Sequence, residues 1–554
     1  MIEDLWYKNA VVYCLDVETF MDGNDDGVGD FRGLRRRLDY LAGLGVTCIW
    51  LMPFFPSPNR DNGYDISDYY GVDPRLGDLG DFVEFTHQAK LHGIRVIIDL
   101  VVNHTSDQHP WFQAARKDPD GAFRNFYVWS KKKPADAHKG MVFPGVQEST
   151  WTYDKEARAY YFHRFFKHQP DLNTANPAVR EEILKVMGYW LELGVHGFRV
   201  DAVPFLVELK GVKNHDVENP HGLLTELREF LSWRRGDAIL LAEANVTMDE
   251  VKKYFGDNDR MQMVFNFMAN QHLFVALATG DASGLVKALR ASPKLPHTAQ
   301  WGNFLRNHDE LDLGRLPAAE RKKVFAAFGP DPDMQLYDRG LRRRLACMLE
   351  GDRRRIELAY SLMFSLPGTP VLWYGDELGM GEDLAQPERQ AVRTPMQWSA
   401  EPHGGFTRAE KPVKPLVSKG PFAYAHVNVA QQRRDPQSQL NWMERLIRAR
   451  KECRELGWGS CQVLASGSRS VLALHYTWRQ SRMVVVHNIS SRPLSVRLDL
   501  KDPEQQRCPL LNVLSTDHCA PGEDGRHSLT LEGYAYRWFR VGAQDDARPG
   551  SASA

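Results

Sequence analysis

The sequence lacks any apolar run near the roughly 20 residues that a membrane-spanning helix requires. Its most apolar stretch, residues 356–374, is interrupted by Glu357 and by Pro367-Gly368. An excess of one charge is also absent, because 70 Lys and Arg residues balance 71 Asp and Glu residues. Without a basic field to hold polyanions, neither nucleic acid nor a membrane surface is an expected partner.

Cysteine is scarce, with seven residues among 554 and no Cys-x-x-Cys pair. An odd, scattered set of thiols favours buried free cysteines over a disulfide or zinc framework. The first residues, Met1-Ile-Glu-Asp-Leu, lack the basic and apolar segments of a secretory signal. We therefore expect a cytoplasmic protein of the size of an enzyme.

Short apolar runs alternate with amphipathic segments through most of the chain. Residues 11–15, 46–51 and 94–102 are almost continuously apolar, which is typical of parallel strands covered on both faces. Helical spacing of apolar residues predicts one helix over residues 31–44. Later strands are expected at residues 197–200, 238–242, 261–267, 302–305 and 371–374. Eight such units predict an α/β fold with a closed (β/α)8 TIM barrel.

Two regions interrupt this alternation. Residues 104–176 form too long a stretch for a loop, and they predict a subdomain B inserted after the third strand. Beyond residue 460, strand patterns alone predict a C-terminal antiparallel β-sandwich over residues 461–543. The catalytic barrel would comprise residues 1–103 and 177–460, with a lid segment at about 312–348. A disordered tail is expected at residues 544–554.

Acidic side chains follow three of the predicted barrel strands: Asp201, Glu243 and Asp309. Because the carboxyl ends of barrel strands meet at one face, we expect these acids at one mouth. Glycoside cleavage requires a pair in which one carboxyl group is ionised and the other is protonated. We expect Arg199 to lower the pKa of Asp201, and partial burial to raise the pKa of Glu243. Helix capping or pairing with an arginine is the alternative for each acid alone.

Five motifs, in this order along the chain, resemble glycoside hydrolase family 13, the α-amylase superfamily. They are Asp99-Leu-Val-Val-Asn-His104, Gln169-Pro-Asp-Leu-Asn173, Gly197-Phe-Arg-Val-Asp-Ala202, Ala242-Glu243 and Asn307-His-Asp309. The resemblance implies Asp201 as the nucleophile, Glu243 as the general acid/base and Asp309 as the residue that stabilises the transition state. It also implies a route that retains the anomeric configuration through a covalent glucosyl-enzyme, with no organic cofactor.

The same resemblance implies a set of substrate-binding residues: Asp61, Tyr64, His104, Arg199, His308 and Arg393. Asp61 would accept hydrogen bonds from the distal hydroxyls of a single terminal glucose, and Tyr64 would stack on its apolar face. His104 and His308 would donate to hydroxyls beside the cleaved bond. Arg393 would help to seal the pocket.

The loop at residues 22–30 alternates oxygen-bearing side chains with glycines that allow a tight turn. Asp22, Asn24, Asp26, Asp30 and the carbonyl of Val28 suit a structural Ca²⁺ or Mg²⁺ ion. A plain Asx-rich turn is the alternative. A second ion site is implied by the resemblance alone. It would use Asn103, Asp171 and Glu208 with the carbonyls of Phe205 and Leu206.

Within the family, several stretches resemble the branch that interconverts maltose and trehalose. They are residues 304–311, 341–346, 352–358, 365–372 and 392–398. Such an enzyme must keep water from the glucosyl-enzyme. The expected partner is a small α-glucoside such as maltose or trehalose, and a homo-oligomer is compatible with the sequence.

Other readings stay open. Residues 14–20, residues 265–272 and Gly314 depart from that branch at positions that handle the acceptor. An α-glucosidase or a transglucosylase with another acceptor is therefore the alternative. A non-catalytic carbohydrate-binding homologue is a remoter one, because such proteins lack one or more of the three acids.

Two arginine runs remain, Arg35-Arg36-Arg37 and Arg353-Arg354-Arg355. Because the net charge is −1, we interpret both as solvated helix faces with local ion pairs rather than as binding patches. Trp398 is interpreted as a packing residue, since large aromatic side chains dominate ordinary cores.

Overall fold

The computed structural model describes residues 3–208, 219–500 and 502–542. Eight parallel strands close into a barrel in the order β1-β14-β10-β9-β8-β7-β3-β2, which confirms the predicted (β/α)8 architecture. The strands are β1 (Val12–Leu15), β2 (Cys48–Leu51), β3 (Arg95–Leu100), β7 (Gly197–Val200), β8 (Ile239–Ala242), β9 (Met263–Phe265), β10 (Gln300–Phe304) and β14 (Thr369–Trp373).

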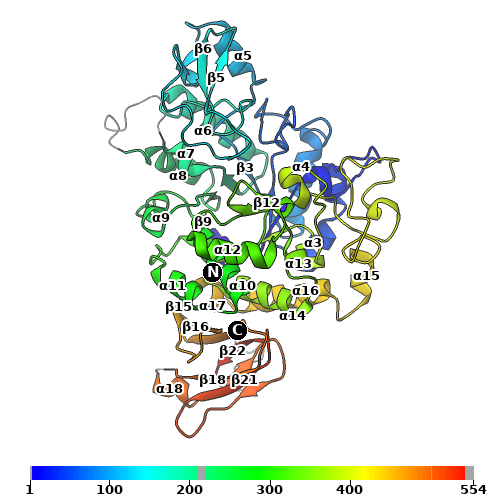
Figure 1. The fold of residues 1–554 in the computed structure, drawn as a ribbon, viewed down its shortest axis with the longest axis vertical. Coiled ribbons are helices and arrows are strands. Elements are labelled where there is room, and N and C mark those ends of the chain that lie inside the picture. Colours follow the sequence, from blue (N-terminus) through cyan, green and yellow to red (C-terminus); the bar gives the residue numbers. More distant parts are fainter. Residues whose placement is uncertain (1–2, 209–218, 501, 543–554) are drawn as a thin grey trace.

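Helices surround this barrel (Figure 1). They include α2 (Phe31–Arg35), α3 (Leu38–Leu44), α4 (Leu79–Leu91), α6 (Pro177–Glu192), α8 (Gly222–Arg234), α10 (Phe267–Thr279), α11 (Ser283–Ala291), α14 (Arg353–Ser365) and α16 (Gln439–Glu452). The single helix predicted over residues 31–44 is wrong. The chain leaves helical geometry at Arg37, where φ is −107° and ψ is 7°, and apolar spacing does not report such a break.

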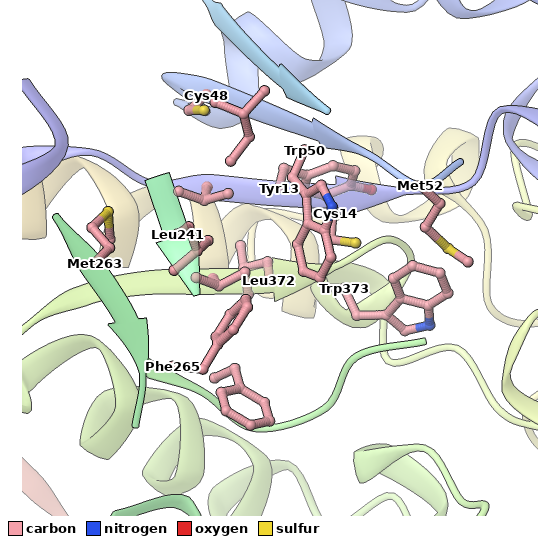
Figure 2. Packing of buried hydrophobic residues seen from close by; sticks show 14 of the residues in the cluster. Tyr13, Cys14, Cys48, Trp50, Met52, Leu241, Met263, Phe265, Leu372 and Trp373 are labelled. Atoms are coloured by element: carbon pink, nitrogen blue, oxygen red, sulfur yellow. The ribbon is translucent and has the colours of Figure 1, made fainter. Parts of the chain in front are cut away.

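Large side chains fill the interior of the barrel (Figure 2). Trp50, Trp373, Leu241 and Phe265 are all buried there. Removing an aromatic ring from such a position costs about 3–5 kcal/mol, because the surroundings cannot collapse into the cavity. The packing also positions a carboxylate at the carboxyl end of the barrel, because the indole Nε1 of Trp50 donates to Asp99 at 3.0 Å.

Residues 104–176 lie between β3 and α6, and they form the insert drawn in cyan in Figure 1. The insert holds α5 (Pro110–Lys117) and a three-stranded antiparallel sheet in the order β4-β6-β5. These strands are β4 (Trp129–Ser130), β5 (Trp151–Asp154) and β6 (Ala159–Phe162). A bridge between His104 and Asp171 joins the two ends of the insert beside the mouth of the barrel.

A second excursion separates β10 from α14. It contains β11 (Leu311–Asp312), α12 (Ala318–Phe328), β12 (Gln335–Leu336), β13 (Gly340–Leu341) and α13 (Leu345–Met348). The three short strands form one antiparallel sheet in the order β11-β13-β12. This segment coincides with residues 312–348, where we expect a lid.

The C-terminal region is an antiparallel sandwich, as predicted, and lies at the opposite end of the molecule from the insert (Figure 1). Six strands pair in the order β15-β16-β17-β22-β19-β20, and β18 pairs with β21. Their bounds are β15 (Ser460–Val463), β16 (Val471–Trp478), β17 (Ser481–Asn488), β18 (Leu494–Leu498), β19 (Leu510–Asn512), β20 (His518–Cys519), β21 (His527–Leu531) and β22 (Tyr536–Val541). A separate apolar core that includes Val484, Leu498 and Phe539 lies within this region.

The tail predicted at residues 544–554 lies outside the described residues. In the described ranges, no helix combines the length and the apolar character needed to cross a membrane.

Candidate active site

Arg199, on β7, ion-pairs with three carboxylates at the mouth of the barrel. Its Nη1 lies 2.7 Å from Asp99 and 2.5 Å from Asp201, and its Nη2 lies 2.8 Å from Glu243. The guanidinium is buried, with 1% of the side chain exposed. One fixed cation therefore holds the carboxyl groups that follow β7 and β8 close to one another.

Burial sets the charge of this pair. It raises the pKa of Asp201 to about 6, against the opposing effect of Arg199, and Asp99 contributes to the increase. Arg199 lowers the pKa of Asp201, as expected, but desolvation outweighs the ion pair and the net shift is upward. Burial, with help from Asp201, raises the pKa of Glu243 to about 7. Between these two values Asp201 is mostly ionised while Glu243 is mostly protonated.

Asp309 has the opposite balance. Burial acts to raise its pKa, but His308, Arg389 and Arg393 hold the pKa well below the usual range. The nearest nitrogens of these residues lie 3.0 Å, 2.8 Å and 3.2 Å from its carboxylate oxygens. Asp309 therefore stays ionised, which suits a group that accepts hydrogen bonds from sugar hydroxyls and stabilises positive charge.

Arg389 also pairs with Asp61, at 2.8 Å, and so joins two acids of the mouth. Sequence reasoning named Arg393 and missed Arg389. The sequence contained one indication of Arg389, namely that this second arginine lies four residues before Arg393. Asp61 further accepts a hydrogen bond of 2.9 Å from Gln169. This contact ties the wall of the mouth to the inserted subdomain.

Tyr64 and His308 support this arrangement as a stacked pair. Their ring centroids lie 5.6 Å apart with the planes 10° from parallel, and the Tyr64 hydroxyl is 2.7 Å from His308 Nε2. Burial lowers the pKa of His308 to about 4, so the imidazole is neutral. His104 Nε2 donates to the carbonyl of Tyr64 at 3.1 Å.

These side chains surround a cavity of about 1000 Å³, the size of a small-molecule site. Six of the predicted catalytic and substrate-binding residues are on its wall: Asp61, Tyr64, His104, Asp201, Glu243 and Asp309. Three others, Arg199, His308 and Arg393, are not on the wall but contact residues that are. The wall therefore carries the groups that touch a ligand, and a second layer holds them in place.

The inserted subdomain and the segment before α14 meet at this cavity. Arg339 donates to the carbonyl of Val142 at 2.6 Å, and the rings of Phe143 and Tyr337 lie 4.7 Å apart. Arg339 also ion-pairs with Glu310 at 3.1 Å. We call these contacts between the insert and the lid segment the cover of the cavity. They join parts of the chain about 200 residues apart, so no local sequence pattern predicts them.

The loop at residues 22–30 folds as a turn in which carboxylates accept backbone N–H groups. Asp22 accepts from Asn24, Asp25 and Gly27, Asp26 accepts from Val28, and Asp30 caps α2. Burial raises the pKa of Asp30, and the charges of Asp22 and Asp26 add to the effect. No cluster of three or more acidic, His or Cys groups in the described ranges is arranged to hold an ion.

The second set of ion ligands does not fit a cation in this arrangement. Arg164 ion-pairs with Glu208, and its backbone N–H donates to Asp171 at 2.7 Å. The side-chain amide of Asn103 donates to Asp171 at 3.1 Å. The ring of Phe205 lies 4.9 Å from the Arg164 guanidinium carbon, and the carbonyl of Leu206 accepts a hydrogen bond from Thr174. The guanidinium of Arg164 supplies the positive charge that an ion would bring.

Comparison with known proteins agrees with this geometry. Residues 16–324 and 341–459 match the catalytic domain of α-amylases, and residues 481–540 match the C-terminal domain of sucrose hydrolase-like proteins. The chain is 43% identical to a trehalose synthase of Thermus thermophilus over 98% of its own length, but it spans only 56% of that relative.

Two further matches extend this comparison. A trehalose synthase/amylase of Mycolicibacterium smegmatis is 41% identical, with 99% of this chain and 94% of the relative covered. Among solved structures, the isomaltulose synthase of Klebsiella sp. LX3 superposes with a TM-score of 0.77 at 26% identity, covering 97% of this chain and 99% of that one.

Proposed function

The chain belongs to the α-amylase family, and on that premise we propose that it interconverts maltose and trehalose by moving one glucosyl unit inside a closed pocket. The observation that carries the proposal is the sharing of Arg199 by Asp201 and Glu243. A close pair of carboxyl groups favours retention of the anomeric configuration, because no water fits between them to attack directly. Both maltose and trehalose carry α-linked glucose, so a retaining route connects them.

In the first step, Asp201 attacks the anomeric carbon of the non-reducing glucose of maltose. The bond from this carbon to the bridging oxygen breaks, and Glu243 gives its proton to that oxygen. The products of the step are a glucosyl ester on Asp201 and a free glucose. The order of the two pKa values, about 6 for Asp201 and about 7 for Glu243, gives each group the required charge.

In the second step, the released glucose turns in the cavity and presents its anomeric hydroxyl. Glu243, now ionised, takes the proton of that hydroxyl, and the hydroxyl oxygen displaces Asp201 from the anomeric carbon. Trehalose forms, and both acids return to their starting charge. The reverse sequence converts trehalose to maltose through the same intermediate.

The ion pair between Arg389 and Asp61 supports the selection of a single terminal glucose. Arg389 bridges Asp61 and Asp309, with 2.8 Å to each, and both acids are on the wall of the cavity. Two carboxylates fixed in this way suit hydrogen bonds from adjacent hydroxyls of one terminal sugar.

The contacts of the cover support transfer over hydrolysis. Arg339 with Val142 and Phe143 with Tyr337 join the insert to the lid segment across the cavity, which limits the access of water to the glucosyl ester. The size of the cavity, about 1000 Å³, also leaves room for an acceptor other than glucose. This observation favours the α-glucosidase or transglucosylase as the second candidate.

The deciding experiment incubates the purified protein with maltose and resolves the sugars over time. We expect trehalose to exceed free glucose throughout, and one glucose released per bond cleaved would contradict the transfer. Arg339→Ala should raise the glucose fraction severalfold while maltose is still consumed, because the cover loses its contact with the insert. Lys322→Ala, an exposed position on α12, is the matched control and should leave the product ratio unchanged.

We further propose that the loop at residues 22–30 holds one structural Ca²⁺ or Mg²⁺ ion. Asp22, Asn24, Asp26, Asp30 and the carbonyl of Val28 would hold it, and the ion would neutralise the acids of this loop, including Asp30, which caps α2. Support comes from the mutual repulsion of these acids. An increase of the melting temperature on titrating chelator-treated protein with Ca²⁺ is expected, and an unchanged temperature would remove the ion from the proposal.

A cytoplasmic location is proposed on the cysteines. All seven are free, and Cys14, Cys48, Cys453 and Cys519 are buried. Such thiols persist in a reducing compartment. Secretion of the native protein to the medium, detected on fractionation of the cells, would contradict this location.

A further inference from the structure

A second cavity, of about 930 Å³, shares no lining residue with the catalytic one. Its wall is formed by Met21, Asp22 and Asp25 before α2, by the junction between α2 and α3, by residues 398–410 and by α15 (Val429–Arg434). These parts of the chain are far apart in sequence. The proposed chemistry of maltose and trehalose makes no use of this cavity.

Four arginines line this second cavity, which we name the arginine cavity: Arg36, Arg37, Arg408 and Arg433. Their neighbours Arg32 and Arg35 ion-pair with Asp81 and Glu84. By contrast, none of the four has a carboxylate within ion-pair distance among the described residues. The predicted solvated face is confirmed for Arg36, which is exposed, but Arg37 is half-buried, and neither of them forms the expected ion pair among the described residues.

Aromatic rings, rather than acids, hold two of these arginines. The guanidinium carbon of Arg37 lies 4.1 Å from the ring centroid of Trp398, and that of Arg433 lies 5.2 Å from the ring of Tyr40. The two rings contact each other edge to face, with centroids 5.1 Å apart. Trp398 thus packs as predicted, but its packing also positions a cation. A pair of guanidinium groups is held on one rigid aromatic support.

The hydrogen-bonding capacity of Arg37 is only partly used. Its Nε is buried and has no hydrogen-bond partner, and its Nη2 contacts the sulfur of Met21 at 3.3 Å. A thioether is a weak acceptor. Burial lowers the pKa of Arg37, and the charges of Arg36 and Arg433 act in the same direction. Like charges that have no carboxylate within ion-pair distance cost free energy that a directly bound anion would recover.

The chemistry of the lining narrows the class of anion. A guanidinium group binds phosphate with two parallel hydrogen bonds, and a phosphate monoester carries up to two charges for several arginines to share. Five carboxylates also reach the wall, namely Asp22, Asp25, Asp39, Glu401 and Glu410. They would repel a long polyanion, but they can accept hydrogen bonds from hydroxyl groups. A small molecule with one phosphate and several hydroxyls satisfies both sets of side chains.

We propose that the arginine cavity is a binding site for a phosphorylated sugar, with the phosphate on Arg37 and Arg433 and the hydroxyls on the carboxylates of the rim. The cavity volume, about 930 Å³, accommodates such a ligand with its bound water. The site stands whether or not the catalytic cavity acts on maltose, because the two cavities share no lining residue.

The test is calorimetric titration of the full chain with glucose 6-phosphate, inorganic phosphate and glucose. Saturating glucose is present during the phosphate titrations, so that the catalytic cavity is already occupied. We expect glucose 6-phosphate to bind one site, and more tightly than inorganic phosphate does. Arg37→Gln and Arg433→Gln should each weaken this binding about tenfold, because a charge-assisted hydrogen bond is lost. Arg434→Gln, exposed on the same helix and outside the cavity, should leave binding unchanged.

Three results would overturn the proposal. The first is the absence of any heat of binding for glucose 6-phosphate at millimolar concentration. The second is an unchanged affinity for glucose 6-phosphate in the Arg37→Gln/Arg433→Gln double variant. The third is an equal affinity for glucose 6-phosphate and inorganic phosphate, which would show that the sugar is not recognised. Because Arg37 packs on Trp398, its loss could unfold the region. Arg36→Glu therefore serves as a second variant at an exposed position, and it should also weaken binding. Thermal melting and maltose conversion check that each variant is folded.

Discussion

The catalytic cavity and the arginine cavity have similar volumes, about 1000 Å³ and 930 Å³, and charged side chains line both. They differ in how those charges are partnered. In the catalytic cavity a buried arginine or histidine contacts each of the three catalytic acids: Arg199 contacts Asp201 and Glu243, and His308 and Arg393 contact Asp309. In the arginine cavity, Arg37 and Arg433 rest on aromatic rings and have no carboxylate partner among the described residues.

This difference separates two ways of preparing a site. A buried network of paired charges fixes both position and protonation before a ligand arrives, which is the requirement of catalysis. Arginines without a carboxylate partner keep their hydrogen-bond donors available for a ligand that brings its own negative charge, which is the requirement of binding. The two cavities should therefore respond differently to the same kind of mutation.

The largest effect is expected from Asp201→Asn. The amide keeps the shape of the side chain but cannot attack the anomeric carbon, so kcat for maltose should fall on the order of 10⁴-fold or more. Quantifying trehalose and glucose over long incubations measures this loss. Because no cavity residue is shared, glucose 6-phosphate binding should persist in this variant. Turnover near the level of the unmodified protein would remove Asp201 as the nucleophile.

A matched pair of arginine variants tests the difference in partnering directly. Arg199→Gln leaves buried carboxylates without their cation and should lower the free energy of unfolding by about 3–5 kcal/mol. Arg36→Gln removes an exposed arginine that has no carboxylate partner, and the free energy of unfolding should change by less than about 0.5 kcal/mol. Urea denaturation of both variants at pH 7 makes the measurement. Equal losses of stability would contradict the contrast between the two cavities.

The smallest effect concerns pH. For kcat/KM, activity should fall below about pH 6 as Asp201 gains a proton, and above about pH 7 as Glu243 loses one. The folded-state pKa values of both acids are raised, so these groups make the protein less stable as pH increases from about 4 toward 7. Thermal melting at pH 5 and pH 7.5 tests that sign. A flat activity profile down to pH 4.5 would contradict the assignment of burial as the dominant cause.

Much of the catalytic site could be predicted, because barrel geometry places strand ends together. The positions of Asp201 and Glu243 directly after apolar runs were enough to predict a shared mouth. The direction of the pKa shift of Asp201 was not predictable, since it depends on how much water the folded mouth excludes. Arg389 was missed because its partners, Asp61 and Asp309, lie about 330 and 80 residues away.

The arginine cavity was beyond prediction for a similar reason. An apolar spacing compatible with one helix hides the break at Arg37, and that break turns two arginines toward segments near residue 400 and residue 433. The aromatic partner of each arginine is remote in sequence, because Arg37 packs on Trp398 and Arg433 packs on Tyr40.

By itself, the sequence determined the alternation of strands and helices, the insert, the C-terminal sandwich and the acids at the strand ends, because periodicity and chain order are local properties. Only the tertiary structure decided which charges are partnered, which acids keep a proton and where a second cavity forms. Those outcomes depend on burial and on distances between remote segments, and both exist only after the chain has folded.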